Sequence, residues 1–183
     1  KTDATGGVYI DAEVSPFYGF GTTDSGARID IDARAYRGFG ADDKFTFAAR
    51  LQAKAVLGAS LNGVPSEYLV YSGGGGTVRG QPYQSLGFPY NNTAINTGGT
   101  GFLGASLELR ARVTDTIGVV GFADFGQIAS EGLFGGTTKS HAGAGLGLRY
   151  ATGLGPIRFD VALPVSGDTG KGAQFYIGIG QAF

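Results

Sequence analysis

Hydrophobic and polar side chains alternate with a period of two along most of this chain. Residues 27–36 show the pattern clearly, because alanines and isoleucines at the odd positions alternate with arginines, aspartates and a tyrosine at the even ones. Such alternation is typical of a β-strand with one wet face and one dry face. It recurs in residues 8–14, 45–57, 103–113, 117–126, 141–150, 157–163 and 175–183. The pattern predicts an all-β fold of about eight antiparallel strands.

One long segment, residues 58–101, lacks this periodicity and is rich in Gly, Asn, Ser, Pro and Tyr. A structureless loop of this length is uncommon in a compact soluble domain. Outer-membrane barrels, in contrast, combine long loops at one end with short turns at the other. We therefore expect one domain spanning residues 1–183 that carries a single long loop at 58–101.

A soluble β-sandwich also alternates, so the two architectures must be separated by other features. The predicted strands exceed the roughly 5–6 residues that are most common in soluble proteins. Their wet faces combine arginines with carboxylates, which suits an interior polar network better than a solvated surface. No apolar run reaches the roughly 18 residues of a membrane helix. The sequence thus favours a transmembrane antiparallel β-barrel.

The amino-acid composition argues against several classes of partner and ligand. The chain has 183 residues with 14 basic and 15 acidic side chains, a net charge of -1 that gives no support to a nucleic-acid partner. Its 13 Phe and 9 Tyr are inconsistent with a disordered chain. There is no cysteine, which excludes disulfides and thiolate metal sites. We expect neither a metal nor a cofactor.

Enzymatic chemistry is also not expected. His141 is the only imidazole, and Ser140 beside it would point to the opposite face of a strand, so no nucleophile and base pair is evident. Asp11 with Glu13, and Asp30 with Asp32, are spaced to share the wet face and could bind a cation. Interleaved arginines favour salt-bridge networks instead.

Several motifs carry a family resemblance. Residues 73–80 read GGGGTVRG and are followed by YQSLG, which resembles loop six of the outer-membrane insertase and two-partner-secretion transporter superfamily, also called the bacterial surface antigen superfamily. SLELR at 106–110 resembles the next strand of that family, and FADFG at 122–126 matches its F-x-D-x-G strand motif. GLGLRY and GPIRFD resemble its penultimate hairpin. The last residues, FYIGIGQAF, look like the closing strand of a TamA-like barrel of the translocation and assembly module.

The resemblance implies a set of site residues. Loop six of the family folds into the lumen, so Arg79 is expected to contact Asp124 and Glu108 on the inner wall. Gly76, Val78 and Gly80 would form the loop motif, because glycines allow a tight turn and a guanidinium can engage a carboxylate with two hydrogen bonds. The alternative is that Arg79 is a solvated loop charge.

Phe183 resembles the C-terminal signal by which outer-membrane barrels are recognised for assembly. The alternative role for this residue is an aromatic at the membrane interface. We expect it to share one face of the last strand with Phe175, Ile177 and Ile179.

The function implied by the resemblance is insertion and folding of other outer-membrane proteins, in the bacterial outer membrane and without a cofactor. The expected partners are the lipid bilayer, the assembly machinery or client barrels, and a second copy through self-association. Family members have POTRA repeats and about sixteen strands, so this chain corresponds to a short form, the C-terminal half without those repeats.

The alternative is a closed structural or scaffold barrel, natural or engineered, without insertase or transport activity. A pore is disfavoured, since long charged side chains would fill a narrow lumen. Pairing of residues 8–14 with 175–183 would indicate a closed barrel.

Overall fold

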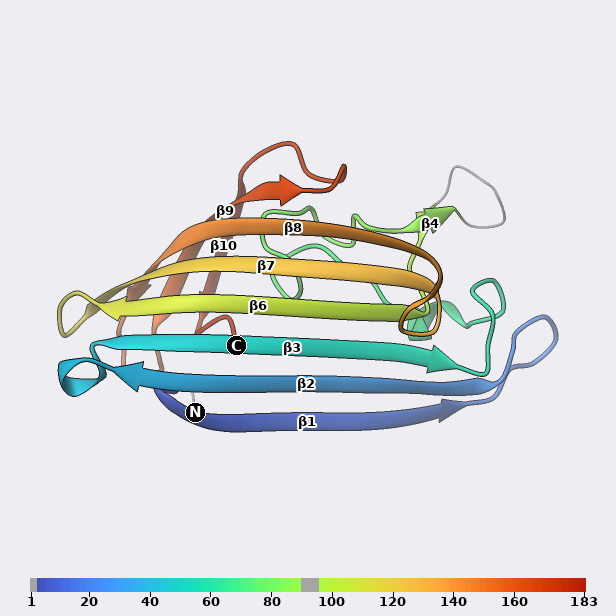
Figure 1. Ribbon diagram of the computed structural model, residues 1–183, viewed down its shortest axis with the longest axis horizontal. Coiled ribbons are helices and arrows are strands. Elements are labelled where there is room, and N and C mark those ends of the chain that lie inside the picture. The colour runs from blue at the N-terminus through green and yellow to red at the C-terminus, as the bar shows by residue number, and fades with distance from the viewer. Residues whose placement is uncertain (1–2, 90–95) are drawn as a thin grey trace.

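The computed structural model describes residues 3–89 and 96–183, and its long strands form one antiparallel sheet. Across this sheet the strands follow the order β1 (Gly6–Phe17), β2 (Gly26–Phe39), β3 (Phe45–Leu57), β6 (Gly101–Arg112), β7 (Ile117–Glu131), β8 (Gly135–Tyr150), β9 (Ile157–Ser166) and β10 (Gln174–Ile179). Each long strand pairs with its neighbour in the chain, and β3 pairs with β6 across the long loop (Figure 1). The prediction of eight antiparallel strands, three before the loop and five after it, is confirmed.

The two faces of the sheet differ as the alternation predicts. On β6, Leu107 and Leu109 are each 49% exposed, whereas Ser106, Glu108 and Arg110 on the other face are buried. Large apolar side chains also remain exposed on the convex side of the other strands. On β1, however, the inner-face residues Asp11 and Glu13 are exposed as well. A soluble protein would bury this apolar face, so the sheet is built with its dry side outward.

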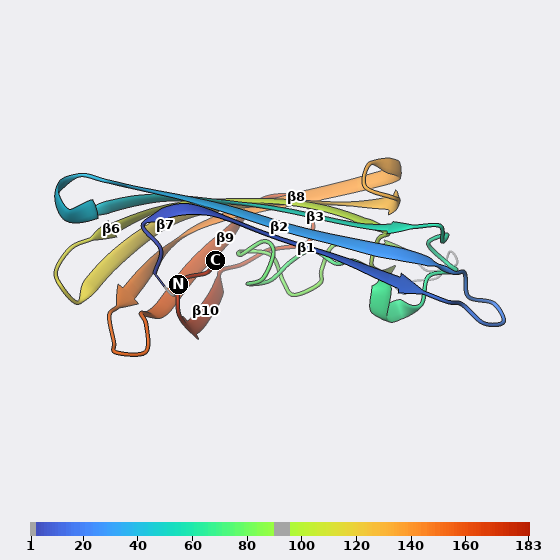
Figure 2. The same ribbon diagram turned by 90° about the horizontal axis from the view of Figure 1, so that it is seen from below.

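The sheet is curved but not closed. Figure 2 shows the long strands as an arch, with β9, β10 and the long loop on the same side of it. Within residues 3–89 and 96–183, β1 pairs only with β2, and β10 pairs only with β9. The structure is therefore an open trough, and the expected closure into a barrel is absent from the described part of the chain.

The last strand is shorter than predicted. It ends at Ile179, because Gly180 adopts a left-handed φ of +91°. The Gly180 N–H still donates to the Pro156 carbonyl at 2.7 Å, in the register of the β9–β10 ladder. The chain then turns onto the concave side of the sheet. The prediction that Phe183 shares a face with Ile177 and Ile179 is wrong for this reason.

The long loop is folded onto the concave face. It contains a short 3₁₀ helix, η2 (Ser66–Tyr68), and a two-residue strand pair, β4 (Phe88–Pro89) with β5 (Asn96–Thr97). A second 3₁₀ helix, η1 (Ala41–Asp43), lies in the turn between β2 and β3. Residues 90–95 of the loop lie outside the described residues. The described residues contain no helix that is long and apolar enough to cross a bilayer.

An apolar cluster attaches the loop to the sheet. Val70, Leu86 and Phe88 from the loop pack against Phe102 on β6 and Ile128 on β7, and all five are buried. Apart from the short β4–β5 pair, isolated bridges connect the described parts of the loop to each other. The loop is thus ordered by individual contacts, which explains why its sequence shows no period.

Candidate functional site

Arg79 extends from the long loop to the inner wall of the sheet, where it is only 2% exposed. Its Nε and Nη2 atoms donate to the two carboxylate oxygens of Asp124 at 2.7 and 3.0 Å, and Nη1 donates to Glu108 Oε1 at 2.6 Å. The main-chain N–H of Arg79 also donates to Asp124 Oδ2 at 3.0 Å. Two parallel hydrogen bonds between a guanidinium and a carboxylate are the strongest form of this ion pair.

The wall supplies further partners from separate strands. Asp160 on β9 places Oδ2 3.4 Å from Arg79 Nη1, and the ring of Phe122 on β7 lies under the guanidinium, with its centroid 3.6 Å from Cζ. Burial alone would lower the pKa of Arg79, but hydrogen bonds and charges from Asp124 and Glu108 more than reverse this effect. The pKa of Arg79 is therefore raised, and the side chain stays charged. We call Arg79, Glu108, Asp124 and Asp160 the arginine clamp.

The loop motif around Arg79 contains residues with different steric demands. Gly80 has a φ of +91°, and a Cβ added there would lie 2.5 Å from the Leu163 carbonyl oxygen, so only glycine fits. Its N–H donates to the hydroxyl of Tyr176 on β10 at 3.0 Å. Gly76, in contrast, has space around an added Cβ and no left-handed φ. The motif thus needs a glycine at position 80 but not at position 76.

Glycines of the sheet make room for the loop. A Cβ added at Gly143 on β8 would clash with the main-chain oxygen of Arg79, and one added at Gly126 on β7 would lie 2.7 Å from a methyl group of Val78. Val78 is fully buried at this point. The loop therefore sits in a recess that exists because these two inward positions carry no side chain.

A second group of polar contacts connects the long loop to β8. Ser72 Oγ lies 2.7 Å from His141 Nε2, and His141 Nδ1 lies 2.9 Å from Thr169 Oγ1, which donates to Gln81 Oε1 at 2.8 Å. Because the Thr169 hydroxyl donates to Gln81, it accepts from Nδ1–H, and Nε2 accepts from Ser72. From the sequence, only the neighbouring Ser140 was considered as a partner of His141. The pairing with Ser72 was missed because Ser72 belongs to a segment without periodicity.

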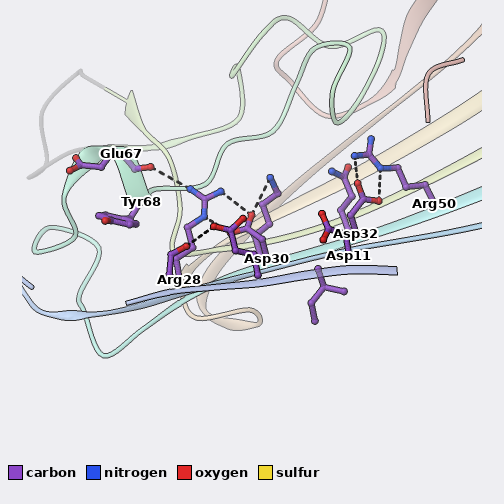
Figure 3. A pocket seen from close by; sticks show the side chains of 12 residues that line it. Asp11, Arg28, Asp30, Asp32, Arg50, Glu67 and Tyr68 are labelled. Atoms are coloured by element: carbon purple, nitrogen blue, oxygen red, sulfur yellow. Dashed lines mark hydrogen bonds and ion pairs between the residues drawn. The ribbon is translucent and has the colours of Figure 1, made fainter. Parts of the chain in front are cut away.

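A polar cavity of about 480 Å³ lies on the inner faces of β1, β2 and β3 (Figure 3). In it, Asp30 pairs with Arg28 and Lys54, at 2.7 and 3.3 Å. Asp32 pairs with Arg34 and Arg50, at 2.7 and 2.6 Å. The prediction of salt-bridge networks is confirmed at Asp30 and Asp32. It is wrong for Asp11 and Glu13, which lie at the exposed strand β1 and form no ion pair within the described residues. Residues 3–89 and 96–183 contain no group of His, Asp and Glu side chains that could hold a metal ion.

The same cavity reaches the loop motif through Arg50. Its Nη1 donates to the main-chain oxygen of Gly76 at 3.2 Å. The loop is therefore held from both sides of the trough, by β3 at Gly76 and by β6, β7 and β9 at Arg79.

Phe183 lies on the concave side, away from the outer apolar face. Arg110 on β6 donates from Nη2 to the main-chain oxygen of Phe183 at 3.0 Å, and its Cζ lies 5.5 Å from the centroid of the Phe183 ring. Arg110 also donates to Glu108 Oε2 at 2.9 Å. Phe183 is thus connected to the arginine clamp, and its position does not match the alternative role of an interface aromatic.

The structure therefore brings together Arg79, Glu108 and Asp124, with Val78 and Gly80 beside them, and leaves Gly76 at the edge of the group. Sequence reasoning missed Asp160 and Tyr176 as partners of the loop. Their positions in strands did carry a signal, because each alternates onto the inner face.

Comparisons with known proteins place the chain in a family. The model of the Omp85 superfamily domain matches residues 1–183. The structure is also similar to the crystal structure of BamA from Haemophilus ducreyi lacking POTRA domains 1-3, with a TM-score of 0.71 and 19% sequence identity. This match covers 93% of the present chain but only 38% of the BamA chain, so the chain spans less than half of that relative. At 19% identity the likeness shows the fold alone. Because the family model matches residues 1–183, the chain belongs to the Omp85 superfamily.

Proposed function

We propose that this chain forms part of a bacterial outer-membrane barrel that assists the insertion and folding of other outer-membrane β-barrel proteins. The observation that carries the proposal is the arginine clamp, in which motif residues of the long loop are buried against the strand that carries FADFG. Within the superfamily we propose a TamA-like relationship, which rests on the residues of the closing strand. Client barrels and the assembly machinery are its proposed partners.

The convex face supports a position in a lipid bilayer. Four outward apolar side chains are 66–78% exposed, namely Val8 and Ile10 on β1, Leu146 on β8 and Ile177 on β10. Side chains of this kind are stable in contact with hydrocarbon and costly in contact with water. The inner face, in contrast, carries the charged pairs.

The short edge strand β10 favours the insertase function over the alternative of a closed structural barrel. Its six residues span about 20 Å at roughly 3.3 Å per residue, which is less than the roughly 30 Å hydrocarbon core of a bilayer. A strand this short would thin the bilayer locally. Its free edge would offer unpaired N–H and C=O groups to an incoming strand.

We propose that this activity requires neither a cofactor nor covalent catalysis. Ser72 and His141 form the one serine–histidine pair among the described residues, but both are fully buried. The partner of His141 Nδ1 is Thr169 rather than a carboxylate. This group holds the long loop against β8 and against Thr169, which follows β9, and a substrate has no access to its buried Ser72 and His141.

Reconstitution into liposomes tests the proposal. Folding of an unrelated outer-membrane barrel, diluted from urea, is followed by its heat-modifiable migration in gels, in empty liposomes and in liposomes that contain this protein. We expect faster folding with the protein and a smaller effect with Arg79→Ala. Leu154→Ser, a change at an exposed turn residue, serves as the matched control. Equal folding rates with and without the wild-type protein would reject the insertase and favour the closed structural barrel.

A further inference from the structure

The side chain of Tyr176 connects β10 to the loop motif. On β10 partly buried residues alternate with exposed ones, so Gln174, Tyr176 and Gly178 share the inner face. The hydroxyl of Tyr176 accepts a hydrogen bond from the Gly80 N–H at 3.0 Å. Gly80 directly follows Arg79 in the chain, so β10 contacts the loop immediately beside the arginine clamp.

The ring of Tyr176 contacts the same loop at a second point. A Cβ added at Gly75 would lie 3.1 Å from Cδ1 and 3.5 Å from Cε1 of this ring, so the main chain of the loop passes close to it. The ring also packs against a buried apolar cluster on β7 and β9 that includes Phe122. Phe122 in turn lies under the guanidinium of Arg79. The Tyr176 side chain is therefore held between the loop and the wall of the sheet.

The neighbouring strand contacts the adjacent loop residue. Asp160 on β9 is the cross-strand neighbour of Tyr176, and its Oδ2 lies 3.4 Å from Arg79 Nη1. Two side chains opposite each other on β9 and β10 thus bind two consecutive residues of the loop. The position of β10 relative to β9 is therefore linked to the position of the loop.

This link matters more for β10 than for the other strands of the sheet. β10 has six residues, whereas the other strands of the eight-stranded sheet have 10–16. A short ladder has fewer main-chain hydrogen bonds, so a side-chain contact has a larger share in holding the strand. Gly80 is buried, and removal of the acceptor of a buried N–H costs more than the hydrogen bond itself contributes.

We propose that Tyr176 is a positioning residue that couples β10 to the arginine clamp. The docked loop motif holds β10 against β9 through this side chain, and release of the loop loosens β10. The coupling is reciprocal, so displacement of β10 also weakens the docking of the loop. Its consequence for activity rests on the proposed function: the docked loop keeps β10 in the position in which a client strand pairs with it.

Hydrogen exchange measured by NMR in detergent micelles can follow the two sides of this link. The Gly180 N–H donates to the Pro156 carbonyl on the β9 side. Because hydrogen-bonded pairs alternate along an antiparallel ladder, the N–H of Gly178 also faces β9. The Gly178 amide therefore reports on β10, and the Gly80 amide reports on the loop.

Removal of one hydroxyl group is the first test. We expect Tyr176→Phe to speed exchange at Gly80 and Gly178 by about threefold or more, because the acceptor of the Gly80 N–H is lost while the ring remains. Amides in the middle of β6 and β7 should change little. Tyr150→Phe, which removes the hydroxyl of a tyrosine on β8 that is 56% exposed, is the matched control and should leave both amides unchanged.

The combination with Arg79→Ala measures the coupling itself. Arg79→Ala releases the loop, so we expect it to speed exchange at Gly178 by about threefold or more when Tyr176 is present. In the Tyr176→Phe background the same change should have a clearly smaller effect. Equal effects in the two backgrounds, or exchange that rises equally throughout the sheet, would overturn the inference.

The liposome assay separates this coupling from the proposed function. With a wild-type protein that accelerates folding of a client barrel, Tyr176→Phe should lower the acceleration by about twofold or more, and Tyr150→Phe should not. Full acceleration by Tyr176→Phe would reject the role of Tyr176 and leave the proposed function standing. No acceleration by the wild type would reject the proposed function, and the exchange measurements would still decide whether β10 and the clamp are coupled.

Discussion

The contribution of Arg79 to the stability of the fold depends on its burial. A solvated arginine in a surface ion pair contributes about 0–1 kcal/mol, whereas removal of one partner from a buried pair costs about 3–5 kcal/mol. Arg79, Glu108 and Asp124 are all buried, so each leaves an uncompensated charge behind when a partner is removed. Removal of any one of these three side chains is therefore expected to destabilise the fold strongly.

This reasoning predicts non-additive effects in a double-mutant cycle. We expect Arg79→Ala and Asp124→Ala each to destabilise the fold by about 3–5 kcal/mol, and the double variant to be destabilised by clearly less than their sum. Urea unfolding in detergent or lipid vesicles provides the measurement. Additive effects within about 0.5 kcal/mol would show that the two side chains do not interact in the folded protein.

The two glycines of the loop motif are expected to differ. Gly80→Ala should destabilise by more than about 1 kcal/mol, because alanine is strained at this left-handed φ and its Cβ would collide with the Leu163 carbonyl. Gly76→Ala should change stability by no more than about 0.5 kcal/mol, since an added Cβ meets open space. The same unfolding experiment compares both variants, and equal effects would contradict the role given to Gly80.

At the level of single residues, sequence information located the clamp only in part. Asp124 and Glu108 could be named because the loop and strand motifs occur together. Tyr176 and Ser72 could not, because their contacts depend on the path of an aperiodic loop across the trough. A period-two pattern shows which face a strand residue occupies, but not which loop atom will reach it.

At the level of elements, the strands were predictable and their ends were not. The alternation identified every long strand, because each one separates an apolar outer face from a polar inner face. Near Gly180 the alternation continues in the sequence although the strand has ended, since the left-handed φ of this glycine redirects the chain. Such a redirection leaves no mark on hydrophobic periodicity.

The loop between β1 and β2 is linked to the long loop by a contact that depends on pH. The Ser60 N–H and hydroxyl donate to Asp24 Oδ2 at 2.9 and 2.7 Å, and these hydrogen bonds lower the pKa of Asp24. The link is therefore complete above the ordinary aspartate pKa of about 3.9 and is lost as pH falls through the lower pKa of the folded state.

Hydrogen exchange of the Ser60 amide measures this effect. We expect slower exchange in the wild type than in Asp24→Asn at neutral pH, and equal rates once the pH is below the folded pKa of Asp24. The ratio of the two rates removes the intrinsic pH dependence of exchange. A ratio that stays constant through the titration would mean that the Asp24 carboxylate does not protect this amide.

For the molecule as a whole, the apolar outer face of the sheet predicts that charged substitutions on it are destabilising in a lipid bilayer. Leu107, half-exposed near the middle of β6, should tolerate a charge poorly, and Leu107→Arg is expected to cost about 2–4 kcal/mol in lipid vesicles. Leu154→Arg, in an exposed turn between β8 and β9, should have little effect. Equal stability of the two variants in vesicles would argue against contact of β6 with hydrocarbon.

The sequence specified this inside-out arrangement but not the closure of the sheet. Alternation determines which side of each strand is apolar, and thus the outward dry face. Closure depends on which strand lies beside β1 and beside β10, and no short-range pattern encodes that choice.

The connections of the arginine clamp also bear on the kinetics of folding. Arg79 contacts residues 45 and 81 positions away in the chain, and Gly80 contacts Tyr176 at a separation of 96. Contacts of such long range form after the intervening strands have joined, because each requires the closure of a long loop. Interactions that form after the transition state slow unfolding without accelerating folding. The clamp would then form late in folding and slow unfolding, and so lengthen the lifetime of the folded protein in the membrane.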